Sequence, residues 1–87
     1  MTDTEVLVAL VELAEQAGLH VRAAQGARDA GPLASSGVCR VREETWIVLI
    51  GDDPLADRIG VVAAALREHA GPWLEERWLP PALRAHL

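Results

Sequence analysis

Residues 37–69 read GVCRVREETWIVLIGDDPLADRIGVVAAALREH, and this stretch decides the fold. Two apolar runs, 38–42 and 46–50, are joined through residues 43–45, which is typical of an antiparallel β-hairpin. The first run alternates apolar and polar residues, so it is expected at or near a sheet edge. The second run is apolar on both faces and is expected to be central or covered on both sides, with Trp46 as the exception near the hairpin turn.

A helix is predicted to follow the hairpin. Asp52-Asp53-Pro54 indicates its start, with Asp53 as the N-cap and the proline at the first helical position. Its apolar seam is formed by Leu55, Ile59, Val62 and Leu66. The helix is predicted to run to about Ala70, where Gly71-Pro72 ends it. His69 continues the seam and is expected to be a core histidine, satisfied by a backbone carbonyl.

The N-terminal part of the chain predicts a helix and a strand. A capping box of Thr2 and Glu5 opens a helix that reaches about Ala17, and Gly18 supplies the left-handed residue that ends it. Its apolar face is formed by Val6, Leu10, Leu13 and Ala17. The polar strip is narrow, so most of the helix surface needs cover. Residues 19–23 alternate like a half-buried strand whose polar residues, His20 and Arg22, face away from the core.

Two further segments complete the predicted architecture. Residues 25–36 are rich in Gly, Ala, Ser and Asp and are predicted to be a flexible loop. Residues 72–87 are predicted to be a C-terminal helical tail, in which two short helical turns are separated by Pro80-Pro81. The fold expected is one α+β domain over residues 1–87 in the order α-β-β-β-α-α, with a small antiparallel sheet of about three strands and helices on one face. The partner of the first strand, which is either the second or the third, is left open.

Composition limits the classes of function. The net charge is −5 and all eight basic residues are arginine, which argues against nucleic-acid binding through electrostatics. One cysteine allows no intramolecular disulfide, and no apolar span approaches the roughly 20 residues that cross a bilayer. The start of the chain has no positively charged region typical of a signal peptide. A cytoplasmic protein that binds no membrane is expected, and the Ala, Arg, Leu and Val bias without Lys or Asn indicates a GC-rich bacterial genome.

Few residues are candidates for chemistry. His69 and Cys39 are weak candidates for metal ligands, and no catalytic residue and no cofactor are predicted. Cys39 is expected to share an inward face with Val41, where a free cysteine behaves as a small hydrophobic residue. His20 and His86 have no partner at a metal-ligand spacing.

The order of hairpin, turn and helix resembles the core of minimal zincin metallopeptidases. Their H-E-x-x-H motif would fall on residues 65–69, where only the second histidine, His69, is present, and one ligand cannot hold a zinc ion. The resemblance implies a diverged metal-binding or peptidase-related protein. Residues 37–40 and 79–84 are also similar to segments of small uncharacterised bacterial proteins, a resemblance that implies no known activity.

The size of the chain favours association. A domain of 87 residues buries only about 60–65% of the surface that its unfolded chain exposes, so a partner surface adds much to its stability. We therefore predict a non-catalytic protein-interaction or regulatory module that self-associates, most simply as a homodimer, with a further protein partner possible. The predicted interface residues are Trp73, Trp78, Leu79 and Leu83, because large aromatic residues often anchor interfaces. The same residues are equally consistent with a C-terminal tail that covers the chain's own core.

Overall fold

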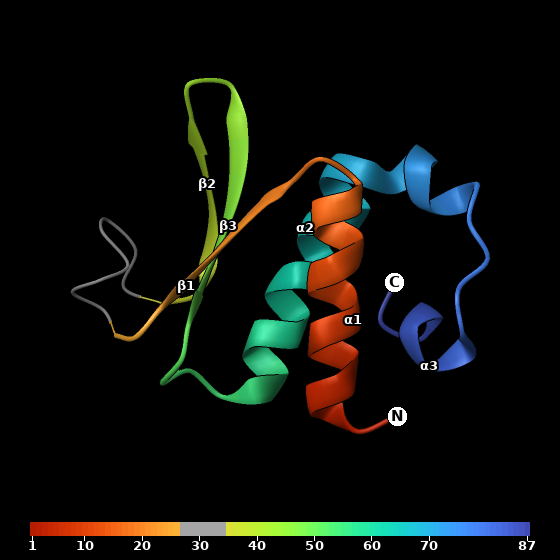
Figure 1. Ribbon diagram of the computed structural model, residues 1–87, viewed down its shortest axis with the longest axis horizontal. Coiled ribbons are helices and arrows are strands. Elements are labelled where there is room, and N and C mark those ends of the chain that lie inside the picture. Colours follow the sequence, from red (N-terminus) through yellow and green to blue (C-terminus); the bar gives the residue numbers. More distant parts are fainter. Residues whose placement is uncertain (27–34) are drawn as a thin grey trace.

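The computed structural model describes residues 1–26 and 35–87. Its elements are α1 (Asp3–Gln16), β1 (His20–Ala24), β2 (Gly37–Val41), β3 (Glu44–Ile50), α2 (Leu55–Glu75) and α3 (Pro81–Arg84) (Figure 1). The predicted α+β order is confirmed. Most of the predicted loop at 25–36 lies outside the described residues.

The sheet has three strands in the order β1-β3-β2. β3 is central, as its apolar pattern predicted, and β2 is its antiparallel hairpin partner at one edge. β1 is parallel to β3, with His20 beside Trp46 and Ala24 beside Ile50. The prediction of an antiparallel sheet is therefore wrong for the β1–β3 pair. β2 is antiparallel to β3, so β1 and β2 run in opposite directions and lie on opposite sides of β3.

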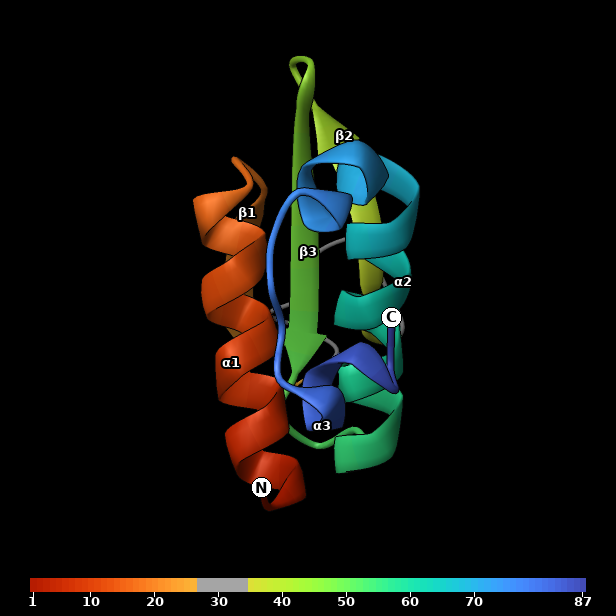
Figure 2. The same ribbon diagram turned by 90° about the vertical axis from the view of Figure 1, so that its right-hand side faces the viewer.

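The elements form three layers. The sheet lies on one side of the α1–α2 pair, and the C-terminal tail with α3 lies on the opposite side of that pair (Figures 1 and 2). The helices thus cover one face of the sheet, as predicted. We call the other face the far face. Side chains alternate along a strand, so Ile47 and Leu49 face the helices, whereas Trp46, Val48 and Ile50 belong to the far face.

The main core lies between the sheet and the two long helices. Val6, Leu10 and Ala14 supply the buried face of α1. Leu13 and Ala17, which the sequence placed in that face, are only partly buried beside it. A smaller apolar cluster of Ala24, Val48 and Ile50, with Cys39 packed against it, lies on the far face.

Both ends of α1 follow the sequence. Thr2 and Glu5 form the complete capping box, with N–H to oxygen distances of 3.0 and 3.2 Å. Gly18 has a φ of +92°, a conformation that glycine adopts without a side-chain clash. The N–H of Leu19 then donates to the carbonyl of Ala14 at 2.9 Å, which satisfies one of the free carbonyls of the last turn.

The start of α2 differs from the prediction. The N-cap is Pro54, whose carbonyl accepts from the amides of Asp57 and Arg58, and Asp53 makes a different contact described below. Helical residues continue to Glu75, but Ala70 leaves helical geometry at φ −140° and ψ 24°. Two helical segments therefore meet at a kink close to the predicted end. No helix of residues 1–26 and 35–87 is both long and apolar enough to cross a membrane.

Candidate interaction surfaces

The two weak metal candidates lie on different elements. His69 is exposed on α2, so its prediction as a core histidine is wrong. The buried face of α2 continues from Leu66 to Ala70, four residues later, and His69 lies outside this face. Cys39 shares a face with Val41 as predicted, but that face is the far face and not the helix-covered one. Among the described residues, no three His, Cys, Asp or Glu side chains gather where they could hold a metal ion.

The C-terminal segment is anchored by leucines. Leu74, Leu79 and Leu83 are buried in the main core, with exposures of 7%, 6% and 5%. Two of the four predicted interface residues, Leu79 and Leu83, therefore cover the chain's own helices. The two tryptophans are the other two predicted interface residues.

The two tryptophans of this segment differ sharply. Trp73 is partly buried, and the Arg77 guanidinium lies 3.9 Å from the centre of its ring, a cation–π contact. Trp78 is 82% exposed, more than any other large hydrophobic side chain of the described residues. It stands immediately before the buried Leu79, so its backbone is held at the surface while its indole is in solvent.

Two arginine side chains hold the same segment in place. The Arg84 guanidinium donates to the carbonyl of Arg77 within the segment at 3.1 Å, and the Arg67 guanidinium of α2 donates to the carbonyl of His86 at 2.6 Å. A shallow hollow of about 270 Å³ lies between the tail and α2. Its lining is formed by Arg67, Gly71, Leu74, Glu75, Leu79, Arg84 and Leu87. The position of the tail is therefore fixed, and so is the position of the Trp78 backbone.

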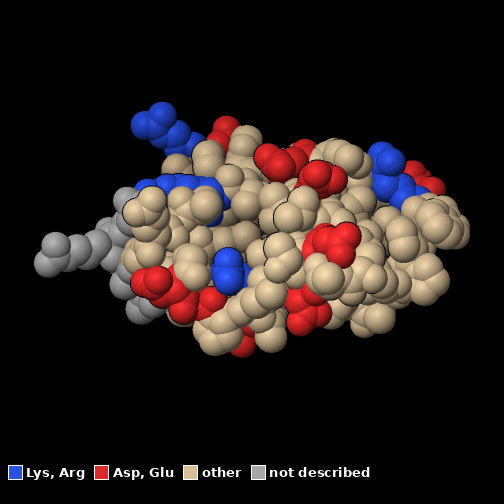
Figure 3. All heavy atoms as spheres, turned by 60° about the horizontal axis from the view of Figure 1, so that its bottom comes forward, with Lys and Arg blue, Asp and Glu red and all other residues tan. Residues whose placement is uncertain are grey.

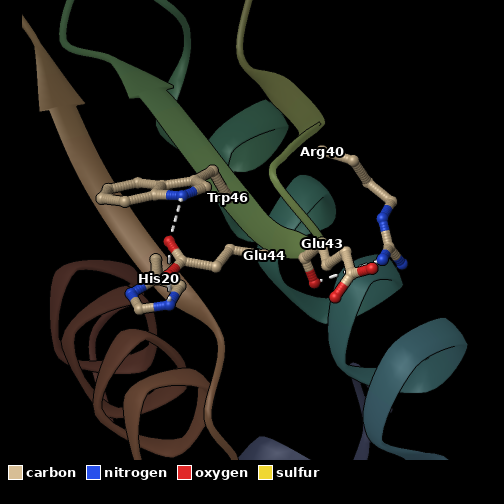
Figure 4. A network of polar contacts seen from close by, with 5 residues as sticks. All are labelled: His20, Arg40, Glu43, Glu44 and Trp46. Atoms are coloured by element: carbon tan, nitrogen blue, oxygen red, sulfur yellow. Dashed lines mark hydrogen bonds and ion pairs between the residues drawn. The ribbon is translucent and has the colours of Figure 1, made fainter.

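A polar and aromatic cluster joins β1 to the hairpin on the far face. The His20 and Trp46 rings stack with centroids 4.7 Å apart and planes 20° from parallel. The Glu44 carboxylate accepts from the Trp46 indole N–H at 3.1 Å and lies 3.5 Å from Nε2 of His20 (Figure 4). Sequence reasoning missed this cluster because it depends on the parallel register of β1 with β3. A hollow of about 290 Å³ adjoins it, lined in part by Glu15 and Leu19.

The hairpin turn is tighter than predicted. It consists of Arg42 and Glu43, and β3 already begins at Glu44. Both turn residues have positive φ, 51° and 72°, which is the signature of a type I′ turn. The Arg40 guanidinium donates to the Glu43 carbonyl at 3.2 Å (Figure 4). Two non-glycine residues therefore occupy a conformation that glycine and asparagine favour.

Ser36 and Asp53 connect β2 to the turn before α2. The amide of Ser36 donates to Oδ2 of Asp53 at 2.7 Å, and the Ser36 hydroxyl oxygen accepts from the amide of Ile50 at 2.8 Å. Hydrogen bonds from the side chain and backbone of Ser36 hold the pKa of Asp53 below its usual range, with a smaller contribution from the Arg58 charge. This role explains why Asp53 does not cap α2.

Charge does not mark a binding face in the view of Figure 3. Acidic and basic side chains are interspersed on the face seen in Figure 3, with wide uncharged areas between them. The chain has no match among protein-family models, curated proteins or solved structures. The resemblance to zincins therefore stays a hypothesis, and the functional argument rests on the surface of the molecule itself.

Proposed function

We propose that this protein is a cytoplasmic, non-catalytic interaction module that acts as a homodimer and contacts a protein partner through Trp78. The observation that carries the proposal is the 82% exposure of Trp78 on a segment fixed by buried leucines. Tryptophan is enriched among the residues that dominate binding energy, and a fixed backbone lowers the entropy lost on binding. The single cysteine is a free thiol, which suits a reducing compartment.

Self-association is supported by the remaining exposed apolar side chains. Met1, Val8, Val38 and Val41 are each more than a third exposed. A small domain that leaves such side chains in water gains stability when a second copy covers some of them. No observation on residues 1–26 and 35–87 favours the alternative of a zincin-like metal protein, since His69 and Cys39 are not gathered with a third ligand.

Sedimentation velocity across the micromolar range tests the homodimer. We expect the sedimentation coefficient to rise with protein concentration, because a weak dimer follows mass action. A monomer at several hundred micromolar would contradict self-association.

Photo-crosslinking tests the role of Trp78. A benzophenone amino acid replaces Trp78 in one variant and the exposed Ala82 in a matched control. In cells that express the protein, we expect a covalent adduct from position 78 that position 82 does not give. An adduct of twice the chain mass would identify the partner as a second copy. Equal adducts from both positions would contradict a specific contact at Trp78.

A further inference from the structure

Among the described residues, the outer edge of β2 has little protection against pairing. The order β1-β3-β2 leaves one side of β2 without a neighbouring strand among the described residues. β2 contains no proline and one charged residue, Arg40. Natural edge strands usually carry charged residues, above all lysine, or a proline or a bulge, because a free row of N–H and C=O groups pairs readily with another strand. β2 therefore carries few of the features that keep an edge strand from pairing.

The hairpin determines which backbone groups of β2 face outward. Val41 and Glu44 are the first and fourth residues of the turn, which makes them a hydrogen-bonded pair. Hydrogen-bonded pairs recur at every second residue of an antiparallel ladder, so Cys39 also directs its N–H and C=O toward β3. Val38 and Arg40 direct theirs to the outer edge.

We propose that two copies of the chain pair antiparallel along the outer edges of β2, about a two-fold axis at Cys39. This inference rests on the proposed self-association and names its surface. In this register Val38 of one copy lies opposite Arg40 of the other, so the outward-facing groups of both strands meet and each such pair exchanges two hydrogen bonds. Cys39 lies opposite its own equivalent as a non-hydrogen-bonded pair, with Cα atoms about 4.5 Å apart.

The charges along β2 fit a second copy of the same strand. Arg40 meets the neutral Val38, and Val41 meets Gly37, so no like charges are opposed. The same centre-to-centre pairing along β1, the other edge strand, would oppose Arg22 to itself. Like charges directly opposite each other destabilise a strand pair. The two edges therefore differ, and only β2 is complementary to itself in this way.

The rest of the molecule is compatible with this pairing. α2 lies over the β2 side of the sheet and α1 over the β1 side, so the two α2 helices become neighbours in the dimer (Figure 2). The two sheets join into one, and the exposed Val41 and the partly buried Cys39 continue across the axis on the far face. Pairing over a five-residue strand is a small interface, which belongs to the weak class. A covalent trap is therefore the sharpest test.

Oxidative crosslinking at the native cysteine provides this trap. Diamide takes up the two hydrogens released when two Cys39 thiols form one disulfide, and the Cα separation of a non-hydrogen-bonded pair lies within the disulfide range of about 4.4–6.8 Å. We expect a reducible dimer on a non-reducing gel, formed faster at higher protein concentration and absent from Cys39→Ser.

The matched control moves the thiol along the same strand. The control is the double variant Cys39→Ser, Val41→Cys. Its thiol is at position 41, which is 49% exposed and therefore more accessible to solvent than position 39. The register, however, separates it from its equivalent by about 13 Å of extended strand. We expect at least tenfold slower crosslinking, and equal rates would mean random collision and overturn the proposal. Failure of Cys39 to crosslink in a sample that sedimentation shows to be dimeric overturns the β2 pairing alone, whereas a monomeric sample overturns both proposals.

Amide hydrogen exchange gives a second readout without substitution. The amides of Val38 and Arg40 face outward in the monomer and are expected to gain protection as the protein concentration rises. The amide of Cys39, which is bonded within the hairpin, should be protected at all concentrations. Rapid exchange of Val38 and Arg40 in the dimer would contradict the pairing.

Discussion

Among residues 1–26 and 35–87, the non-glycine residues with positive φ lie in the hairpin turn. Arg42 and Glu43 both have positive φ, which costs a non-glycine residue on the order of 1–3 kcal/mol. The Arg40 contact to the Glu43 carbonyl offsets part of that cost. The turn is therefore stable because the strands on either side define it, and not because of its own sequence.

Glu43→Gly is expected to stabilise the protein by up to about 1 kcal/mol, because glycine adopts the positive φ without a Cβ clash. Urea unfolding followed by circular dichroism measures the change. Glu12→Gly in the exposed middle of α1 is the control, and it should destabilise by about 1 kcal/mol through lost helix propensity. A loss of stability in both variants would show that the turn is not strained.

Asp53 makes stability depend on pH. Its pKa is lower in the folded protein than in the unfolded chain, where it is about 3.9, so its contribution is complete above that value and is lost as the pH falls through the folded pKa. Asp53→Asn should therefore be less stable than the wild type at pH 7, with the difference shrinking at pH 3. Urea unfolding at both pH values measures this. A difference of constant size at the two pH values would refute the linkage.

At the scale of elements, the C-terminal segment has some side chains buried in the core and others exposed to solvent. Leu79→Ala should cost about 2–5 kcal/mol, because it removes a side chain from the core that the tail shares with the helices. Trp78→Ala should change the free energy of unfolding by less than about 0.5 kcal/mol, as for other surface substitutions. Chemical denaturation of both variants measures these changes in the free energy of unfolding. A Trp78→Ala variant as unstable as Leu79→Ala would place this indole in the fold and not in an interface.

Local sequence patterns predicted the elements well where their cause is local. The capping box of Thr2, the left-handed Gly18 and the central position of β3 all depend on a few neighbouring residues. The parallel pairing of β1 with β3 was not predictable in this way, because it depends on which strand β1 lies beside, and that is decided between segments distant in the sequence. Asp53 was misassigned as a cap because its partner, Ser36, comes from a distant segment.

The candidate surfaces were predictable only in part. Sequence alone singled out Trp78, but it could not separate that exposed side chain from the buried Leu79 beside it. The cluster of His20, Glu44 and Trp46 required the strand register. His69 was misplaced because a helical seam drifts around the axis, and Ala70 takes the core position just before the kink.

For the whole molecule, the helix pair has neighbours on two sides. The sheet covers one side and the tail with α3 covers the other (Figure 1). This arrangement explains why α1 is apolar around so much of its surface, since Leu7, Ala9, Val11 and Leu13 all pack at the margin of the main core. A narrower apolar stripe would be enough for a helix that only lies on a sheet.

The mixed sheet has a consequence for the order in which the molecule folds. β2 and β3 are joined by a two-residue turn, whereas β1 is separated from β3 by residues 25–43 of the sequence, so bringing β1 to β3 costs more loop-closure entropy. Glu43→Gly should therefore accelerate refolding, and Val21→Ala in β1 should mainly accelerate unfolding. Stopped-flow measurements of both rates test this, and slower refolding of Val21→Ala with unchanged unfolding would reverse the order. On this pathway the first strand in the sequence is the last to join the sheet.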